Sequence, residues 1–324
     1  MAILVYIENT DGTLKKSAFE AASYAKAIAD QLGDSVTALS IGNVDAAELE
    51  KLGKYGVSKV LNANQENLKN FVNKAYASII ASAAQQESSK VVVLSNSFSG
   101  KGLAPRVAAK LDAGLADGAI NLPSFQGDSM EIKKTAFSNK AFATEVIKSA
   151  VKVIAVNPNA FEVKEVGGSA EIVDFTPNIE ATDFNVLVKD IVRATDKVTL
   201  PEAEIVVSAG RGMKGPENWG MIEELADVLG AATACSKPVS DAGWRPHSEH
   251  VGQTGIVVSP NLYIAIGISG AIQHLAGVSS SKTIVVINKD PEAPFFKVAD
   301  YGIVGDAFEI VPKLTQAIKN LKNN

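Results

Sequence analysis

The chain repeats one pattern in each half: short runs rich in β-branched residues alternate with longer stretches in which apolar residues recur at helical spacing. Parallel strands need long crossover connections, which helices supply, so this alternation predicts parallel sheets with helices on both faces. The run from Val91 to Leu94 is apolar throughout, which is typical of a strand buried on both sides. In the first half we expect strands at 3–8, 36–41, 59–61 and 91–94, and helices at 17–32, 46–55 and 68–84.

From Ile120 the pattern changes, because the next predicted strands follow one another without helices between them. This succession predicts an antiparallel extension of the first sheet. The strands are expected at 129–134, 141–148, 151–156 and 170–175. A weakly structured stretch follows at 176–182, then a part strand or helix and part linker at 184–199, and Pro201 marks a break in the chain.

The second half restarts the alternation, with strands expected at 204–209, 256–258, 262–266 and 282–288 and helices at 216–229, 270–276 and 308–321. A length of 324 residues suits two domains of about 150 residues each. We therefore predict an α/β protein with two domains, 1–196 and 197–324. Each has a mostly parallel sheet flanked by helices, and the first carries the antiparallel extension.

Composition excludes several functions. A net charge of -5 and an aromatic content of 6% provide neither the basic surface nor the stacking platform of a nucleic-acid-binding protein. The segment 250–281 has no Asp, Glu, Lys or Arg, but polar residues and glycines interrupt it, so we expect no membrane span. The single cysteine, Cys235, rules out an internal disulfide. The low cysteine content, together with an N-terminus whose pattern is that of a strand and not of a leader peptide, predicts a cytoplasmic protein.

The strongest local motif is the run Gly210-Arg211-Gly212-Met213-Lys214-Gly215, which fits a G-x-G-x-x-G pattern between a predicted strand and a predicted helix. Glycines there let the backbone approach a phosphate, and Pro216 suits the first position of a helix. A plain tight turn is the alternative. A typical NAD site has an acidic residue about 20 residues later, and this chain has none there. The motif therefore favours a nucleotide held through its phosphates, with Arg211 and Lys237 as cations.

Two further segments could contribute to such a site. In Val251-Gly252-Gln253-Thr254-Gly255 the glycines flank an amide and a hydroxyl that can bond to a ring edge or a phosphate; a polar loop before a buried strand is the alternative. In the run from Ile268 to His274, Ser269 is expected to cap a helix whose free N–H groups could hold a phosphate.

Other reactive residues do not assemble into catalytic sets. His247 and His250 lack a third ligand and read as part of a solvated loop, so we predict no metal site. His274 reads as a hydrogen-bonded core imidazole when its segment is taken alone. Lys237 lies close to Cys235 in the sequence and could lower the pKa of its thiol. No histidine stands beside Cys235, so we do not expect it to be a nucleophile. We read 97–102 as a helix-capping loop and predict no catalytic residue.

Taken together, these motifs are more specific than any one of them. The runs GRGMK (210–214), DAGW (241–244), VGQTG (251–255), LYIAIGISGAIQHL (262–275), NKDPEAP (288–294) and ADYG (299–302) closely resemble the FAD-binding domain of the electron-transfer flavoprotein alpha subunit. In the first half, Gly100, Lys101, Leu103 and the run from Pro105 to Leu111 resemble the amino-terminal domain of that family.

The resemblance implies an electron carrier, not an enzyme with its own substrate. It implies electrons accepted from flavin dehydrogenases, such as acyl-CoA dehydrogenases of fatty acid β-oxidation, and passed to a membrane quinone reductase or another acceptor. It implies a heterodimer in which domain 1–196 packs on a beta subunit. The FAD-binding residues that it implies are Arg211, Ser236, Lys237, Val251, Gly252, Gln253, Thr254, Ser269, Gly270, Ala271, Ile272, Gln273, His274, Asn288 and Asp306.

Particular roles follow from the resemblance. Thr254 would bond to flavin N5 and His274 would lie beside the pyrimidine carbonyl O2, where a donor stabilises negative charge. Gln253, Ser269 and Ser236 would bind the ribityl chain and pyrophosphate, with Asn288 and Asp306 near the ribose and adenine. Lys237 stands where many family members have arginine and lacks the planar guanidinium. An electron-bifurcating variant, a non-redox nucleotide-binding module and an NAD-dependent dehydrogenase stay open as alternatives.

Overall fold

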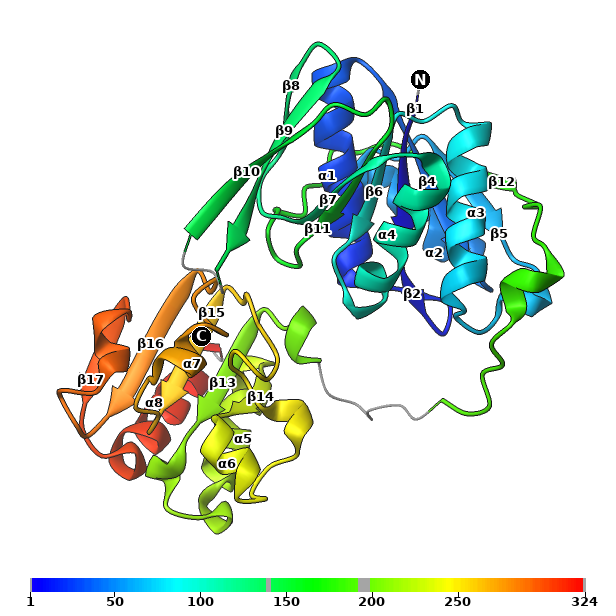
Figure 1. The fold of residues 1–324 in the computed structure, drawn as a ribbon. Coiled ribbons are helices and arrows are strands. Elements are labelled where there is room, and N and C mark those ends of the chain that lie inside the picture. The colour runs from blue at the N-terminus through cyan, green and yellow to red at the C-terminus, as the bar shows by residue number, and fades with distance from the viewer. Residues whose placement is uncertain (1, 138–140, 192–198, 323–324) are drawn as a thin grey trace. The chain divides into compact units, whose positions relative to one another are not determined.

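The computed structural model describes residues 2–137, 141–191 and 199–322 (Figure 1). The chain divides into two compact units. Unit 1 comprises 1–135 and 142–193, and unit 2 comprises 136–141 and 194–324. The boundary predicted between 196 and 197 lies outside the described residues. The α/β fold class is confirmed, with a large mixed sheet in unit 1 and a separate parallel sheet in unit 2.

Unit 1 is built on a long sheet whose strands follow the order β10-β9-β7-β11-β6-β1-β4-β5-β12, with β8 paired to β9. The strands are β1 (Ala2–Ile7), β4 (Ser35–Ile41), β5 (Lys59–Ala63), β6 (Val91–Ser95), β7 (Gly114–Ala119), β8 (Ser124–Gln126), β9 (Ser129–Ala136), β10 (Ala141–Ile147), β11 (Lys152–Val156) and β12 (Glu171–Asp174). A two-stranded hairpin, β2 (Asn9–Thr10) with β3 (Thr13–Leu14), follows β1.

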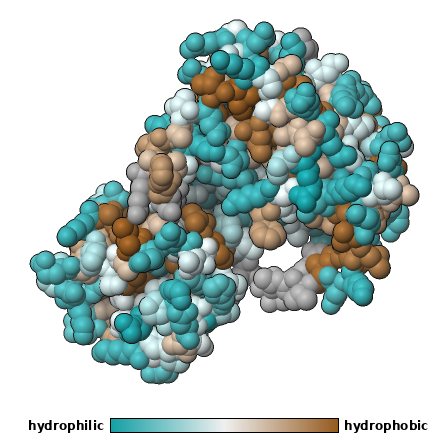
Figure 2. All heavy atoms as spheres, viewed as in Figure 1, coloured by the Kyte–Doolittle hydropathy of each residue, from teal (hydrophilic) through white to brown (hydrophobic). Residues whose placement is uncertain are grey.

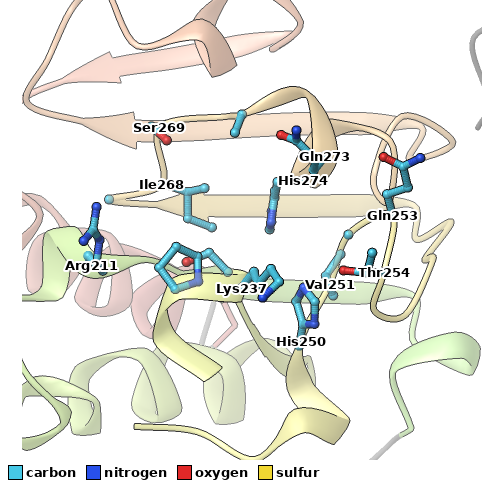
Figure 3. Close-up of a pocket in the computed structure, with 15 residues that line it drawn as sticks. Arg211, Lys237, His250, Val251, Gln253, Thr254, Ile268, Ser269, Gln273 and His274 are labelled. Carbon is cyan, nitrogen blue, oxygen red and sulfur yellow. The ribbon is translucent and has the colours of Figure 1, made fainter. Parts of the chain in front are cut away.

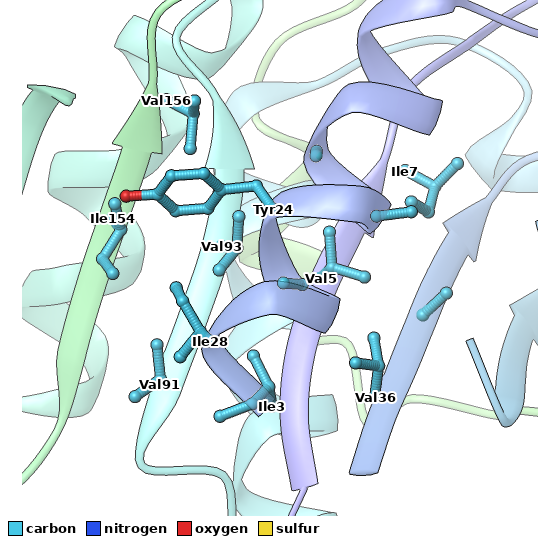
Figure 4. Packing of buried hydrophobic residues seen from close by; sticks show 14 of the residues in the cluster. Ile3, Val5, Ile7, Tyr24, Ile28, Val36, Val91, Val93, Ile154 and Val156 are labelled. Atoms are coloured by element: carbon cyan, nitrogen blue, oxygen red, sulfur yellow. The ribbon is translucent and has the colours of Figure 1, made fainter. Parts of the chain in front are cut away.

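Helices cover both faces of this sheet, and alternate residues of β1 show how. Ile3, Val5 and Ile7 face α1 (Lys16–Leu32) and the short α2 (Ala46–Glu50), whereas Leu4 and Tyr6 face α3 (Asn73–Gln86) and α4 (Phe98–Leu111). Figure 4 shows Tyr24 and Ile28 of α1 lying over the strands of the first face. Successive side chains of a buried parallel strand thus enter two different cores, which explains why such strands are apolar at every position.

The first half differs from the prediction in several places, and strands β2, β3, β7 and β8 were not predicted. Strands β11 and β12 pair parallel, β11 with β6 and β7 and β12 with β5, so neither belongs to the antiparallel part. Every residue of β11 is buried, because β6 and β7 pair with its two edges and its alternate side chains enter the cores on the two faces of the sheet. Antiparallel pairing is present where β9 joins β7 and β8. Helix α3 begins at Asn73 because a 3₁₀ turn at Glu66–Leu68 precedes it, and helix α4 was not predicted.

Of the helix-capping loop predicted at 97–102, the cap is confirmed but the loop is wrong, because residues 98–102 already belong to α4. The Ser97 side chain accepts a hydrogen bond of 2.9 Å from the backbone N–H of Gly100 at the start of α4. The Ser97 hydroxyl also donates to Glu8 at the end of β1, at 2.5 Å. The resemblance of this segment to a phosphate loop is therefore explained by the capping of α4.

Unit 2 has a five-stranded, all-parallel sheet in the order β14-β13-β15-β16-β17. Helices α5 and α8 cover one face, and mostly irregular segments around 250–260, 268–281 and 293–299, which include the short α7, cover much of the other. The elements are β13 (Ile205–Ala209), α5 (Gly220–Leu229), β14 (Ala232–Cys235), α6 (Lys237–Asp241), β15 (Leu262–Ile266), α7 (Ile272–Leu275), β16 (Thr283–Asn288), β17 (Tyr301–Val304) and α8 (Ala307–Lys322).

Two predicted elements of unit 2 are wrong or shortened. The segment 256–258 is not a strand of the sheet: Ile256 makes one isolated bridge to Val251, and Val258 is buried in the core instead. The helix predicted at 216–229 begins as a 3₁₀ turn, Pro216–Asn218, and becomes α-helical only at Gly220. None of the helices in the described part of the chain combines the length and hydrophobicity needed to cross a bilayer.

The order of strands opens a space at the carboxyl ends of β13 and β15. From β13 the chain moves to one side to form β14 and then returns to the other side to form β15. Connections leave the carboxyl ends of β13 and β15 in opposite directions, and ligands of open α/β sheets bind in the crevice created at such a point.

Candidate functional site

A cavity of about 480 Å³ lies at this switch point of unit 2 (Figure 3). Segments that follow β13, β14 and β15 line it, together with the loop after His250 and the start of α7. The lining residues are Arg211, Ser236, Lys237, Pro238, His250, Val251, Gly252, Gln253, Thr254, Gly267, Ile268, Ser269, Ala271, Gln273 and His274.

Glycines bring two of these segments into contact. A Cβ on Gly210 would lie 2.4 Å from the carbonyl oxygen of Gly267, and one on Gly212 would lie 2.6 Å from the Gly267 Cα. The backbone N–H of Gly212 donates to that same carbonyl at 3.1 Å. The glycines of the G-x-G-x-x-G run therefore serve the close packing of the ends of β13 and β15, and the residue between them, Arg211, lines the cavity.

The loop from Val251 to Gly255 forms a second wall. It is held by backbone hydrogen bonds from Val251 N–H to the Cys235 carbonyl, 3.0 Å, and from Gln253 N–H to the Gln273 carbonyl, 2.7 Å. Gly252 has φ +151°, a conformation that residues with side chains rarely adopt. Gln253 and Thr254 consequently stand exposed at the cavity on a loop whose backbone is tied to β14 and α7.

The third wall is the turn from Gly267 into α7. Gly270 has φ +83°, and a Cβ there would lie 2.5 Å from the backbone nitrogen of Phe295, so this turn tolerates no side chain. The predicted cap is wrong: the residue before α7 is Ala271, and α7 has no side-chain cap. Ser269 instead lies exposed at the cavity, and its carbonyl accepts a hydrogen bond from Phe295 N–H at 3.1 Å.

His274, on α7, is the most perturbed group at the site. Its ring is 7% exposed, and its Nε2 lies 3.0 Å from the hydroxyl of the fully buried Tyr263. Burial, helped by the nearby His250, lowers the pKa of His274 to about 4, so the imidazole is neutral at pH 7. Burial raises the pKa of Tyr263, whose hydroxyl therefore keeps its proton. We assign Tyr263 as donor to Nε2, which puts the imidazole proton on Nδ1.

The cations at the cavity are differently placed. Lys237 begins α6, and its ammonium pairs with Asp241 at 2.7 Å, with both side chains more than half exposed. Cys235, the last residue of β14, is fully buried, and burial raises its pKa to about 12. The idea that Lys237 lowers the pKa of this thiol is therefore wrong, and the thiol packs as an apolar core group.

The structure brings together eleven of the fifteen residues predicted to bind the cofactor. Gly270 and Ile272 belong to the same turn but do not line the cavity. Asn288 and Asp306 line a separate space of about 50 Å³, which shares Gly267 with the main cavity. There the Asn288 amide donates to the Ile268 carbonyl at 3.0 Å, and Asp306 accepts from Phe308 N–H at 2.9 Å at the start of α8.

Four lining residues were not predicted: Pro238, His250, Gly267 and Ile268. Of these, His250 contradicts the expected solvated loop most clearly, since it is only 2% exposed and pairs with Cys235 in an isolated parallel bridge. Its position directly before the Val251–Gly255 motif was the available signal. His247, three residues earlier, is exposed, as that loop prediction expected.

The chemistry of the cavity fits an anionic, hydrogen-bonding cofactor. The fifteen lining residues include two permanent cations, Arg211 and Lys237, and no carboxylate. Two buried ring nitrogens, Nδ1 of His250 and Nδ1 of His274, make no hydrogen bond within the usual distance and angle limits. The backbone of Val251 lies near Nδ1 of His274. Unpartnered buried polar atoms beside a cavity are expected where a bound molecule completes the network.

A second cavity, of about 520 Å³, lies in unit 1 at the ends of β1 and β4. Several of its polar side chains are engaged by the chain itself. The Tyr76 hydroxyl donates to the Leu68 carbonyl at 2.9 Å, and the Asn9 amide donates to the Ile41 carbonyl at 2.9 Å. The unit 2 cavity, with exposed hydroxyls and amides at its walls, is therefore the better candidate for a cofactor.

A parallel α/β domain with a cationic, glycine-built cavity at its switch point defines the class of nucleotide-cofactor-binding proteins. Comparison with known families narrows this class. Residues 3–180 match the family described as "Electron transfer flavoprotein domain", and residues 199–279 match "Electron transfer flavoprotein FAD-binding domain". The chain belongs to the electron transfer flavoprotein alpha-subunit family, as the motifs predicted.

Individual relatives agree over nearly the whole chain. Electron transfer flavoprotein subunit alpha of Bacillus subtilis is 40% identical over 325 residues, covering 98% of each chain. The Pseudomonas aeruginosa protein of the same name is 40% identical over 98% of this chain and 100% of its own. A Clostridium saccharobutylicum relative named Protein FixB is 35% identical over 98% and 96%. The family's role in electron transport with a flavin is thus shared by this chain.

Proposed function

We propose that this chain holds FAD in the unit 2 cavity and works as a heterodimer with a beta subunit, without substrate turnover of its own. In this role it carries electrons in the cytoplasm from flavin dehydrogenases, such as acyl-CoA dehydrogenases, to a quinone reductase or another acceptor. One observation carries the proposal: eleven residues predicted for FAD, from separate segments of the sequence, line a single cavity at the carboxyl edge of a parallel sheet.

Different lining residues would bind different parts of FAD. Bound FAD would supply the electron chemistry. Arg211, Ser236, Ser269 and Gln253 provide a charge, two hydroxyls and an amide for the pyrophosphate and ribityl chain. Thr254, exposed on a loop with a fixed backbone, donates to the ring edge. The neutral His274 stabilises negative charge near the pyrimidine carbonyl as a hydrogen-bond donor and not as a cation.

The lining supports a flavin carrier over an NAD-dependent dehydrogenase. A typical NAD site needs a carboxylate for the ribose, and none of the fifteen residues around the cavity is acidic. Apolar side chains exposed on unit 1, among them Phe98 at 94% and Leu187 at 81%, suit burial against a second subunit. Hydrophobic residues reach the surface in several places on the face shown in Figure 2.

Co-production with the cognate beta subunit tests the proposal. The expected product is a yellow heterodimer whose flavin bleaches on reduction, with one FAD bound by this chain. Thr254→Ala should keep the fold and shift the flavin midpoint potential, and an unchanged potential would remove Thr254 from its role. A second FAD per heterodimer would favour the bifurcating variant, whereas a colourless product that takes up no FAD in excess would leave only a non-redox module.

A further inference from the structure

The side chain of His250 lies inside the loop that carries Gln253 and Thr254. A Cβ on Gly255 would lie 2.8 Å from its Nδ1, and a Cβ on Gly252 would lie 3.5 Å from its Nε2. Both glycines therefore leave room for the imidazole, which fills the inside of the turn. The His250 carbonyl closes the same turn by accepting from Ile256 N–H at 2.8 Å.

The backbone of His250 ties this turn to the sheet. Cys235, at the end of β14, pairs with His250 in a parallel bridge, and the next residue, Val251, donates to the Cys235 carbonyl at 3.0 Å. The ring is thus held between a rigid strand end and the exposed pair Gln253 and Thr254. In Figure 3 the His250 ring lies next to Thr254, on the same side of the cavity as Lys237. Movement of this ring would move the loop.

A charge on His250 would be felt across the cavity wall. Burial is the main cause that lowers its pKa below 6.5, and the neighbouring charges of His247 and Lys237 act in the same direction, against Asp241. His250 in turn lowers the pKa of His274. The titratable and charged groups on the elements around it are Lys237 and Asp241 of α6, His247, Glu249 and Arg245 of the preceding segment, Cys235 of β14 and His274 of α7.

We propose that His250 is a positioning residue for the cofactor: its buried ring holds Gln253 and Thr254 in place, and a proton gained by the ring raises the reduction potential of the bound flavin. The inference rests on the proposed function, since it concerns the same cavity. The physical reason is twofold. A loop that is fixed before binding loses less entropy when the cofactor binds. A charged imidazole near the flavin stabilises its reduced form, which carries negative charge.

The test uses the heterodimer with the beta subunit and three variants of this chain. His250→Ala removes the ring, His250→Gln keeps a polar side chain that does not titrate, and His247→Gln is the control on the exposed neighbour. FAD dissociation constants are measured by flavin fluorescence. Midpoint potentials are measured at several values between pH 5.5 and pH 8 with redox dyes, at about half-unit steps.

We expect His250→Ala to bind FAD about tenfold more weakly than the parent. His250→Gln should restore most of the affinity but lose the extra rise of potential at acid pH that the parent shows. His247→Gln should bind FAD as the parent does and keep the extra rise of potential, with its onset moved to a higher pH, because the charge of His247 opposes the charging of His250. If His250→Ala does not fold, the potentials of His250→Gln decide the matter.

The outcomes separate this inference from the proposed function. A parent heterodimer that binds no FAD contradicts the proposed function itself. A parent that binds FAD, with His250 variants of equal affinity and equal potential at every pH, overturns only the role of His250. A loss of affinity that neither varies with pH nor recovers in His250→Gln also overturns it, because it indicates a purely structural residue.

Discussion

Replacing His274 by glutamine should make unit 2 less sensitive to acid. The folded chain keeps this imidazole neutral down to a pKa of about 4, whereas in the unfolded chain it titrates at the ordinary 6.5. Below pH 6.5 the unfolded state therefore binds a proton that the folded state does not bind, and the free energy of unfolding falls as the pH is lowered toward 4. Above pH 6.5 both states are neutral and this contribution vanishes.

The size of the effect follows from the two pKa values. Between pH 7 and pH 5 the linkage amounts to about 2 kcal/mol, and over the whole window to about 3 kcal/mol. His274→Gln removes this difference. It also loses the bond to the Tyr263 hydroxyl, which shifts stability by a similar amount at both pH values.

Urea unfolding of the cofactor-free chain, followed by tryptophan fluorescence, measures the effect selectively. Both tryptophans, Trp219 and Trp244, belong to unit 2. The parent should lose about 2 kcal/mol more than His274→Gln between pH 7 and pH 5. His247→Gln, which alters an exposed ring, should follow the parent. Parent and His274→Gln curves that fall in parallel would refute the claim that burial depresses the His274 pKa.

Two further changes test the packing. Gly270→Ala should destabilise unit 2 by at least about 1–2 kcal/mol in the same fluorescence assay, because φ is +83° and the new methyl group meets the Phe295 backbone. The control is Gly220→Ala, in α5 with open space around it, which should be neutral or slightly stabilising. Equal effects of the two substitutions would contradict the argument. Glu20→Ala should destabilise unit 1 by about 1–3 kcal/mol in urea unfolding followed by circular dichroism. The buried Glu20 carboxylate accepts from the N–H groups of Asn159 and Phe161 at 3.0 and 2.9 Å, so Glu20→Gln, which keeps one acceptor oxygen, should lose less.

The lining of the candidate cavity was predictable in large part, for a reason that particular segments make clear. Val251–Gly255 and Ser269–His274 are short runs of glycine beside polar residues; the first comes before an apolar segment and the second after one, and chemistry of that kind is visible in a sequence. The resemblance of these runs to one family then named the residues. His250 was missed because its neighbours in the sequence are polar, whereas its pairing with Cys235 and the turn that encloses its ring bury it in the fold.

Local pattern determined the alternation of strands and helices, the α/β class and the family, because periodic apolar residues and motif residues act over a few positions of chain. Tertiary structure alone decided which strands lie side by side. Val151–Val156 follows other strands directly in the sequence, yet β11 inserts between β6 and β7, where both its faces are covered. In the same way, the glycines at 210 and 212 suggest a phosphate until Gly267 is seen packed against them. Such contacts join residues far apart in the chain, and the free energy of burying both partners, which no local pattern contains, selects them.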